Sequence, residues 1–302
     1  MSLLAVGSVA IDTVETPYGK ANEVLGGSAV YFSFSGGCFT PVRLVGAVGQ
    51  DFPGEFRQVL EEGPIDLEGL EVRDGETFRW DGSYEGTMAE AETRDVELNV
   101  FEDFRPDVPS KFRDSDFVFL ANSDPNTQVH VLNQVDKPVF SLADTMNLWI
   151  DNERDALLEL MSRIDGLILN DAEARQLSER SNLVQAASWV CEHGPDYCII
   201  KKGEHGSLLR GPEGIFVLPA YPAETVKDPT GAGDSFAGGL MGYLAEQGTV
   251  DFPTLKWGVA YGTITSSFTI EDFSLNRLQE ITRDDIDDRV KKFVDYTHLP
   301  RS

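Results

Sequence analysis

The segment that decides the fold of this chain reads Asp228-Pro229-Thr230-Gly231-Ala232-Gly233-Asp234-Ser235-Phe236. Residues 215–218 ahead of it are apolar and predict a strand, whereas residues 236–244 are apolar, rich in small side chains and predict a buried helix. A helix N-terminus presents unpaired backbone N–H groups and the positive end of the helix dipole, and glycine lets an anion approach the backbone closely. The segment therefore predicts an anion site at a strand-to-helix turn.

Asp234 falls in or beside the first turn of that helix, next to the expected anion. A carboxylate opposes phosphate binding there, so we expect it to have a chemical task, and taking a proton from an attacking hydroxyl fits best. The alternative is a glycine-rich turn in which Asp234 only caps the helix. The Gly-Ala-Gly-Asp string by itself leaves both interpretations open.

The length and composition indicate one large α/β domain over residues 1–302. The formal net charge of −26 argues against nucleic acid and anionic membranes as partners, because both are negatively charged. No apolar run is long enough to span a bilayer, and the first residues do not form a signal peptide. The three cysteines match no metal spacing, so we expect reduced thiols in a cytoplasmic protein.

Short apolar segments at 117–121, 139–142, 166–169 and 197–200 alternate with helical patterns. This rhythm predicts a central, mostly parallel sheet with helices on both faces. A first strand is expected over residues 3–9, ending at Asp12. Polar residues follow each strand, at the sheet edge where open α/β sheets bind ligands.

Residues 76–101 differ from this rhythm, because aromatic and β-branched residues alternate there with polar ones. Period-2 alternation predicts strands with one wet face, with a hairpin around Asp81-Gly82. Residues 14–24 are polar and predict a turn or small hairpin. These segments are expected to form a small appended sheet, over about residues 13–24 and 76–101.

The longer string from Asp228 to Gly239 resembles the C-terminal signature of the ribokinase-like (PfkB-type) carbohydrate and nucleoside kinases. The resemblance implies a ribokinase-like fold in which the small sheet is a lid that shields the reaction from water. It also implies that Gly231, Ala232 and Gly233 form an anion hole for the transferred phosphoryl group, with Asp234 as catalytic base.

The resemblance extends to the acceptor side of the site. It implies that Asp12 holds substrate hydroxyls and that the backbone of Gly26 and Gly27 lies against the substrate. Tyr31 stands where the family commonly has asparagine, and it can donate a hydrogen bond or stack a ring. Asp144 and Asn147 belong to a shortened Asp-x-Asn-x-Arg element that lacks the arginine, and both are expected to line the site. The residues expected at the acceptor are Asp12, Gly26, Gly27, Tyr31, Asp144 and Asn147.

The nucleotide side is implied by two further motifs. Asn170 and Glu173 match the Asn-x-x-Glu motif, which organises Mg²⁺ and phosphate through water; the alternative is a capped helix start. The loop from Lys201 to Gly206 resembles the family's nucleotide loop, and no Walker motif is present. The residues expected near the nucleotide are Lys202, Gly203, Gly206 and Thr230. Asp228 matches a position that helps to form a potassium loop in some members.

The sequence thus predicts an ATP- and Mg²⁺-dependent kinase that phosphorylates a hydroxyl of a sugar, with K⁺ as a further expected ion and a homodimer through the lid. One alternative acceptor is a nucleoside, since Tyr31, Phe78, Trp80 and Tyr84 could stack a base or simply pack the lid. The other alternative is a non-catalytic, ligand-binding descendant, against which the intact Gly-Ala-Gly-Asp string argues.

Overall fold

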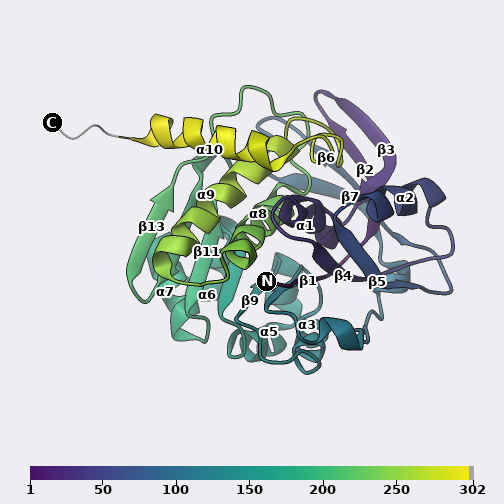
Figure 1. Cartoon of the computed structure of the whole chain (residues 1–302), viewed down its shortest axis with the longest axis horizontal. Helices are drawn as coiled ribbons and strands as arrows, with labels where there is room; N and C mark the ends of the chain where they lie inside the picture. The colour runs from purple at the N-terminus through teal and green to yellow at the C-terminus, as the bar shows by residue number, and fades with distance from the viewer. Residues whose placement is uncertain (299–302) are drawn as a thin grey trace.

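The computed structural model describes residues 1–298. Nine strands form the central sheet in the order β13-β12-β11-β10-β9-β8-β1-β4-β5 (Figure 1). All neighbouring pairs are parallel except β11 with β12 and β12 with β13. The strands are β1 Leu3–Val6, β4 Val42–Val48, β5 Ile65–Val72, β8 Phe117–Leu120, β9 Phe140–Asp144, β10 Gly166–Asn170, β11 Tyr197–Lys201, β12 Ser207–Gly211 and β13 Gly214–Leu218. The expected mostly parallel sheet is confirmed.

Helices cover both faces of this sheet, as strands with two buried faces require. One face packs against α1, α8 and α9, and the Phe32 ring of α1 stacks on Phe119 of β8 with centroids 4.2 Å apart. The other face packs against α3, α5, α6 and α7. The helices are α1 Ser28–Gly37, α2 Gly54–Glu62, α3 Pro125–Leu132, α4 Asn147–Asn152, α5 Arg154–Met161, α6 Asp171–Ser178, α7 Leu183–Glu192, α8 Ala232–Gln247, α9 Phe252–Thr269 and α10 Arg283–Thr297.

A second sheet of four strands, in the order β3-β2-β6-β7, lies at the upper right of Figure 1; it is the sheet for which a lid is predicted, and we call it the lid below. Its strands are β2 Ala10–Thr16, β3 Gly19–Gly26, β6 Phe78–Tyr84 and β7 Ala91–Glu97. The pair β2–β6 is parallel and the other two pairs are antiparallel. The small separate sheet is confirmed, with two differences from the sequence prediction.

The first strand ends at Val6, and Asp12 lies within β2 of the lid rather than after a core strand. The chain leaves the large sheet at Gly7-Ser8, where the amide of Ala29 donates to Ser8 O at 3.1 Å. Because the residues on both sides of this crossing are buried, the hydrophobic pattern runs through it without a break.

The predicted hairpin around Asp81-Gly82 is also wrong. Both residues lie inside β6, where the pairing with β7 shifts register. The connection to β7 falls at residues 85–90 instead. An Asp-Gly pair favours a turn, but pairing on both sides of β6 outweighs that local preference.

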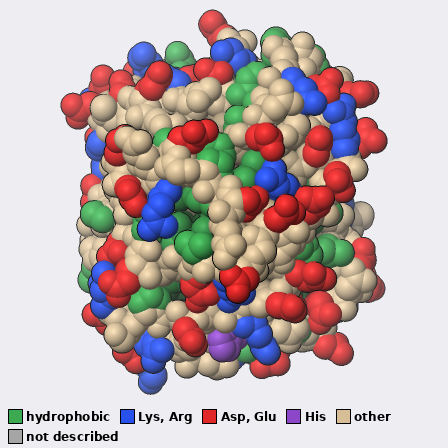
Figure 2. All heavy atoms as spheres, turned by 90° about the vertical axis from the view of Figure 1, so that its right-hand side faces the viewer, with side chains coloured by type: hydrophobic (Ala, Val, Ile, Leu, Met, Phe, Trp, Pro, Cys, Tyr) green, Lys and Arg blue, Asp and Glu red, His purple; other side chains and the backbone are tan. Residues whose placement is uncertain are grey.

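Acidic side chains are spread over the lid-side face of the molecule (Figure 2), in keeping with the net charge of −26. None of the helices within residues 1–298 combines the length and hydrophobicity that crossing a membrane takes. The three cysteines, Cys38, Cys191 and Cys198, are free thiols.

Candidate active site

The turn before α8 is built around Gly231, which has φ 73° and caps the helix. A Cβ atom there would lie 2.3 Å from the Tyr31 ring, so only glycine fits against that ring. The Ala232 amide, expected in the anion hole, donates to Pro229 O at 3.1 Å. Among the described residues the amides of Gly231 and Gly233 have no such partner, while the Asp234 amide bonds to its own carboxyl group. Of the three amides predicted for the anion hole, those of Gly231 and Gly233 are therefore free and that of Ala232 is engaged.

Asp234 stands in the first turn of α8. Burial, followed by the Asp144 carboxylate, raises the pKa of Asp234 to about 7, while the Lys201 ammonium and the Asp234 backbone amide lower it. A carboxyl group with a pKa near neutrality can accept a proton efficiently at that pH.

Three charged side chains meet at the carboxyl ends of β9, β10 and β11, namely Asp144, Glu173 and Lys201. Lys201 Nζ lies 3.0 Å from Asp144 Oδ2, and both side chains are largely buried. Burial lowers the pKa of Lys201, but the carboxylates of Asp144, Glu173 and Asp234 outweigh it and raise that pKa. Asp144 was predicted for this site, whereas Lys201 was passed over in favour of Lys202.

The alternation of side chains along β11 explains why Lys202 was predicted in place of Lys201. Ile199 packs on the α8 side of the sheet and Ile200 on the opposite side. Because strand side chains alternate, Lys201 shares the α8 side with Ile199. A Cβ atom on Gly233 would lie 3.0 Å from Lys201 Nζ, which places the ammonium at the start of α8. The alternation was visible in the sequence, but the face that carries the site was not.

Lys202, Gly203 and Gly206 form a tight loop after β11, closed by a bond from the Lys202 amide to Gly206 O at 2.8 Å. Gly203 and Gly206 both have positive φ, and a Cβ atom on Gly206 would lie 2.0 Å from Leu218 O. The glycines of this loop are thus required by its backbone.

Asn170 and Glu173 cap the start of α6 reciprocally. Asn170 Oδ1 accepts the Glu173 amide at 2.8 Å, and Glu173 Oε2 accepts the Asn170 amide at 2.7 Å. Burial and then the Asp144 carboxylate raise the pKa of Glu173, and Lys201 lowers it. Glu173 Oε1 has no hydrogen-bond partner among the described residues, so it is available to a ligand.

The acceptor-side residues gather where the lid meets α1. A Cβ atom on Gly26 would lie 1.9 Å from Asp12 Oδ2, so this carboxylate lies directly against the Gly26 backbone. Gly27 caps α1 with φ 102°, and a Cβ atom there would lie 2.5 Å from Ser8 O. Burial and then Asp228 raise the pKa of Asp12 to about 7, a hydrogen bond from Gly27 lowers it, and Asp234 raises it further.

Two predicted acceptor residues are placed differently. Tyr31 is only 2% exposed and packs against Gly231, so its ring is not free to stack a ligand. Its buried hydroxyl has no partner among the described residues. Asn147 is exposed, and its Oδ1 accepts the Leu148 amide at the start of α4. The contact of Asn147 that the structure shows is therefore with its own helix end.

The aromatic residues of the lid have distinct surroundings. Phe78 stacks on Phe101 with centroids 5.7 Å apart, which is lid packing. Tyr84 Oη lies 3.4 Å from Thr230 Oγ1 and so joins the lid to the turn before α8. Trp80 pairs with Asp12 across the β2–β6 register and is half-buried. The backbones of Trp80 and Asp12 are therefore adjacent, while the Trp80 indole Nε1 donates to Thr93 Oγ1 of β7 at 3.2 Å and its ring lies over Gly82.

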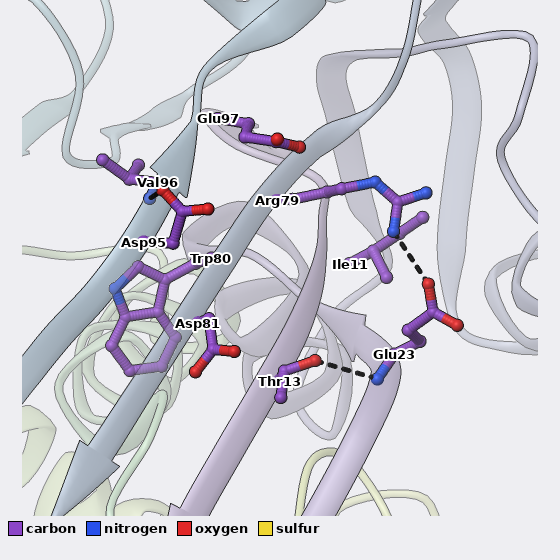
Figure 3. Close-up of a pocket in the computed structure, with 9 residues that line it drawn as sticks. All are labelled: Ile11, Thr13, Glu23, Arg79, Trp80, Asp81, Asp95, Val96 and Glu97. Carbon is purple, nitrogen blue, oxygen red and sulfur yellow. Dashed lines mark hydrogen bonds and ion pairs between the residues drawn. The ribbon is translucent and has the colours of Figure 1, made fainter.

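A cavity of about 170 Å³ opens on the lid (Figure 3). It is lined by Ile11 and Thr13, which alternate with Asp12 along β2 and therefore face the opposite side of the sheet. Arg79 bridges Glu23 of the lid and Asp51 of the large domain, at 2.9 Å each. Trp80, the partner of Asp12 in the β2–β6 register, also lines this cavity.

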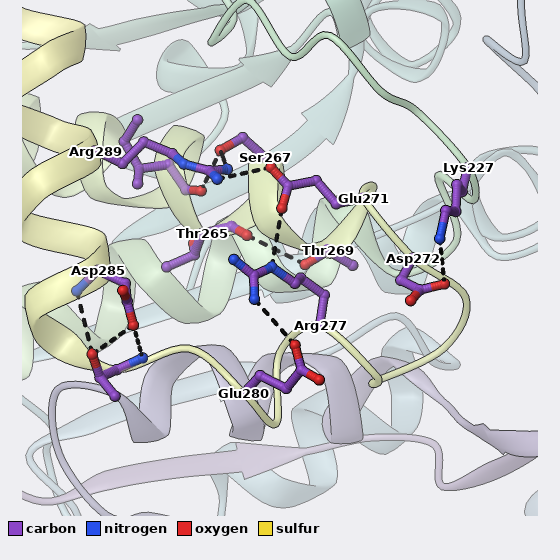
Figure 4. A network of polar contacts seen from close by, with 12 residues as sticks. Lys227, Thr265, Ser267, Thr269, Glu271, Asp272, Arg277, Glu280, Asp285 and Arg289 are labelled. Atoms are coloured by element: carbon purple, nitrogen blue, oxygen red, sulfur yellow. Dashed lines mark hydrogen bonds and ion pairs between the residues drawn. The ribbon is translucent and has the colours of Figure 1, made fainter.

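The loop at 270–281 ties the two sides of the site together. Ser274 donates its amide to Asp228 Oδ2 at 3.3 Å and its hydroxyl to Leu25 O at 2.6 Å. Ion pairs hold the loop (Figure 4), with Lys227–Asp272 at 3.2 Å and Arg277–Glu271 at 3.1 Å. Within residues 1–298 there is no group of three or more His, Cys, Asp or Glu side chains that could hold a metal ion.

Comparison with known proteins places this geometry in a family. The family described as pfkB family carbohydrate kinase matches residues 2–276. A cytidine kinase of Thermococcus kodakarensis is 30% identical over 258 residues, which are 80% of this chain and 88% of that protein. The nucleoside kinase of Burkholderia thailandensis, solved with inosine, superposes with a TM-score of 0.80 at 20% identity and full coverage of both chains. An E. coli ribokinase II, solved with ATP and Mg²⁺, superposes with a TM-score of 0.80 at 17% identity, covering 96% of this chain and 99% of that one. The two solved structures share the fold of this chain, and the family match extends over most of its length. The chain therefore belongs to the pfkB family of carbohydrate kinases.

Proposed function

We propose that this kinase transfers the γ-phosphoryl group of ATP to a ribose hydroxyl of a nucleoside. The observation that carries the proposal is the pairing of Trp80 with Asp12 in the β2–β6 register of the lid. A carboxylate suits the hydroxyls of a ribose, and an aromatic ring beside it suits a planar base. The cytidine kinase and nucleoside kinase relatives support this acceptor over the free sugar expected at first.

Asp12 accepts two ribose hydroxyls in this proposal, and the Gly26-Gly27 backbone lies alongside. In the free protein the pKa of Asp12 is raised to about 7, burial being the largest cause. Two hydroxyl donors favour the ionised form, because hydrogen bonds to a carboxylate lower its pKa. Acceptor binding therefore relieves an unfavourable buried charge.

Asp234 is the general base. The acceptor oxygen bonds to the γ-phosphorus as the bond from phosphorus to the departing ADP oxygen breaks, and the hydroxyl proton passes to Asp234. The free amides of Gly231 and Gly233 donate to the transferred group as its charge redistributes. The Ala232 amide is already engaged with Pro229 O, so we leave it out of the anion hole.

The residues at the nucleotide side fit Mg²⁺. Glu173 keeps one carboxylate oxygen free beside Asp144, and Mg²⁺ in proteins takes a few oxygen ligands and retains much of its water. Glu173 would hold the ion through water, with Asn170 fixing its side chain, and the ion would neutralise charge on the phosphates. The loop of Lys202, Gly203 and Gly206 is proposed to face the nucleotide.

The residues fit potassium poorly. Both carboxylate oxygens of Asp228 already accept backbone amides, Oδ1 from Thr230 at 2.9 Å and Oδ2 from Ser274 at 3.3 Å. The adjoining carboxylates of Glu271 and Asp272 are paired with fixed cations. No step of the proposed reaction uses potassium.

A screen of ADP release over nucleosides, ribose and fructose tests the acceptor. Trp80→Ala is expected to lower kcat/KM for nucleosides by about 10- to 100-fold, the usual worth of one base stack, and to leave a weak ribose reaction unchanged. Trp257→Ala, an exposed tryptophan of α9, is the matched control. A preference for ribose or fructose over every nucleoside would instead support the sugar acceptor that the sequence predicted. Absence of any acceptor-dependent ADP release would favour the non-catalytic alternative.

We also propose that the lid carries a homodimer contact. Every residue of β7, the edge strand of the lid, is exposed in the single chain. An exposed edge presents unpaired backbone groups to a second strand. Sedimentation at two salt concentrations tests this, and a monomer under both conditions would end the proposal.

A further inference from the structure

We propose that Lys201 is a further catalytic residue, whose ammonium, held by Asp144, binds the phosphoryl group during transfer. This inference rests on the proposed kinase mechanism and extends it to a side chain outside the glycine-rich turn. It also assigns Asp144 a positioning task instead of a direct contact with the acceptor.

Geometry places Lys201 at the right point. The lysine side chain runs along Gly233, since a Cβ atom there would lie 3.0, 3.7 and 3.8 Å from its Nζ, Cε and Cδ atoms. The Gly233 amide has no hydrogen-bond partner among the described residues. The ammonium and this amide therefore lie at the same helix start, where a phosphoryl oxygen could accept from both.

The hydrogen bonds of Lys201 leave capacity for a ligand. An ammonium has three donors, and Asp144 Oδ2 at 3.0 Å is the one partner of Nζ among the described residues. The side chain is 19% exposed, so water reaches little of it. A largely buried ammonium with donors to spare is costly unless a ligand takes them, and phosphoryl oxygens are suitable acceptors.

The charge around Asp234 requires such a cation. The carboxylates of Asp144, Glu173 and Asp234 all act on Lys201, so three acidic groups share one ammonium. A polyanionic phosphate entering this cluster without a cation would be repelled. Asp144 keeps the ammonium in place, because its other oxygen, Oδ1, is fixed by the Thr145 amide at 2.9 Å.

The competing explanation is that Lys201 only neutralises buried Asp144. The two roles differ in what they predict for ligands that carry or lack the transferred group. A phosphoryl-binding lysine discriminates a non-hydrolysable ATP analogue from ADP, whereas a purely structural lysine affects both alike.

The test uses Lys201→Met, which removes the charge, with Lys201→Arg as the conservative variant and Lys137→Met, at an exposed lysine between α3 and β9, as the matched control. Lys201→Met is expected to lower kcat by about 100-fold or more, the usual effect of removing one donor to the transition state, with the nucleoside KM little changed. It should weaken binding of the ATP analogue about 10-fold while ADP binding stays within about 2-fold, a discrimination worth one order in the binding constant. Lys201→Arg should recover part of kcat, and Lys137→Met should resemble the wild type.

Removing Lys201 alone leaves Asp144 buried and unpaired, so Lys201→Met could fail to fold. The double variant Asp144→Asn with Lys201→Met avoids this, because it removes both charges together, and the same losses are expected in it. The inference is overturned if the wild type is active and either variant keeps kcat within a few-fold, or loses ADP and analogue binding equally. If the wild type turns over no nucleoside but the analogue-specific binding loss appears, the acceptor proposal fails and the role of Lys201 stands.

Discussion

Replacing Asp12 with asparagine should stabilise the fold while removing acceptor binding. Asp12 is 5% exposed, and burial together with Asp228 raises its pKa from 3.8 to about 7. A carboxyl group that holds its proton more tightly in the folded protein than in the unfolded chain lowers stability as pH rises between those two values. The penalty is therefore fully present above pH 7 and absent well below pH 4.

The size of this penalty follows from the shift. About three pKa units at 1.4 kcal/mol each correspond to roughly 4 kcal/mol at pH 8, and about 1 to 2 kcal/mol of that is already present at pH 5. Asparagine carries no charge at either pH. The stability advantage of Asp12→Asn over the wild type should thus grow by about 3 kcal/mol between pH 5 and pH 8.

Urea unfolding of both proteins at half-unit pH steps measures this difference. Asp95→Asn, an exposed carboxylate of the same lid, is the control and should show no such growth. The variant should also lose at least about 2 kcal/mol in kcat/KM for the nucleoside, because a charge-assisted pair of hydrogen bonds is removed. A stability difference that stays constant from pH 5 to pH 8 would refute the buried, protonated state of Asp12.

Asp234→Asn should reduce turnover at least about 100-fold, since the general base is lost, with ATP binding measured by calorimetry unchanged; turnover within a few-fold of wild type would remove Asp234 from that role. Amide hydrogen exchange over lid residues 78–97 should slow when the nucleoside binds, and equal exchange at saturating nucleoside would contradict a lid that closes on the acceptor. Gly231→Ala should destabilise the protein by more than the roughly 1–2 kcal/mol that positive φ alone costs, because its Cβ would overlap the Tyr31 ring. Gly86→Ala, with φ +57° and open space around it, measures the φ cost alone, so equal losses in the two alanine variants would show that Tyr31 does not restrict this turn.

Much of the core and of the turn before α8 could be predicted from the sequence. The residues of the turn are consecutive in the sequence. Glycine is needed at position 231 because the backbone there has a positive φ. Central strands of the large sheet such as β1 and β8 are short runs buried on both faces, so composition alone marks them. The capping box of Asn170 and Glu173 is likewise local, spanning three residues of one helix start.

The remaining features of the candidate site were decided by the tertiary structure, because they depend on residues that are far apart in the chain. Lys201 and Lys202 are adjacent in sequence and chemically alike, and only the packing of α8 on one face of β11 distinguishes them. From the sequence, Tyr31 was expected to be available to a ligand, but in the structure the turn at Gly231 packs against its ring.

The acceptor side shows the same division most clearly. Asp12 and Trp80 are neighbours because β2 pairs in parallel with β6, and a parallel register between distant strands is not encoded in either strand alone. The raised pKa of Asp12 likewise comes from burial and from Asp228, which the fold brings to it from the other end of the chain. The sequence determined the kind of chemistry through a contiguous turn, while the pairing of strands decided what stands beside the acceptor.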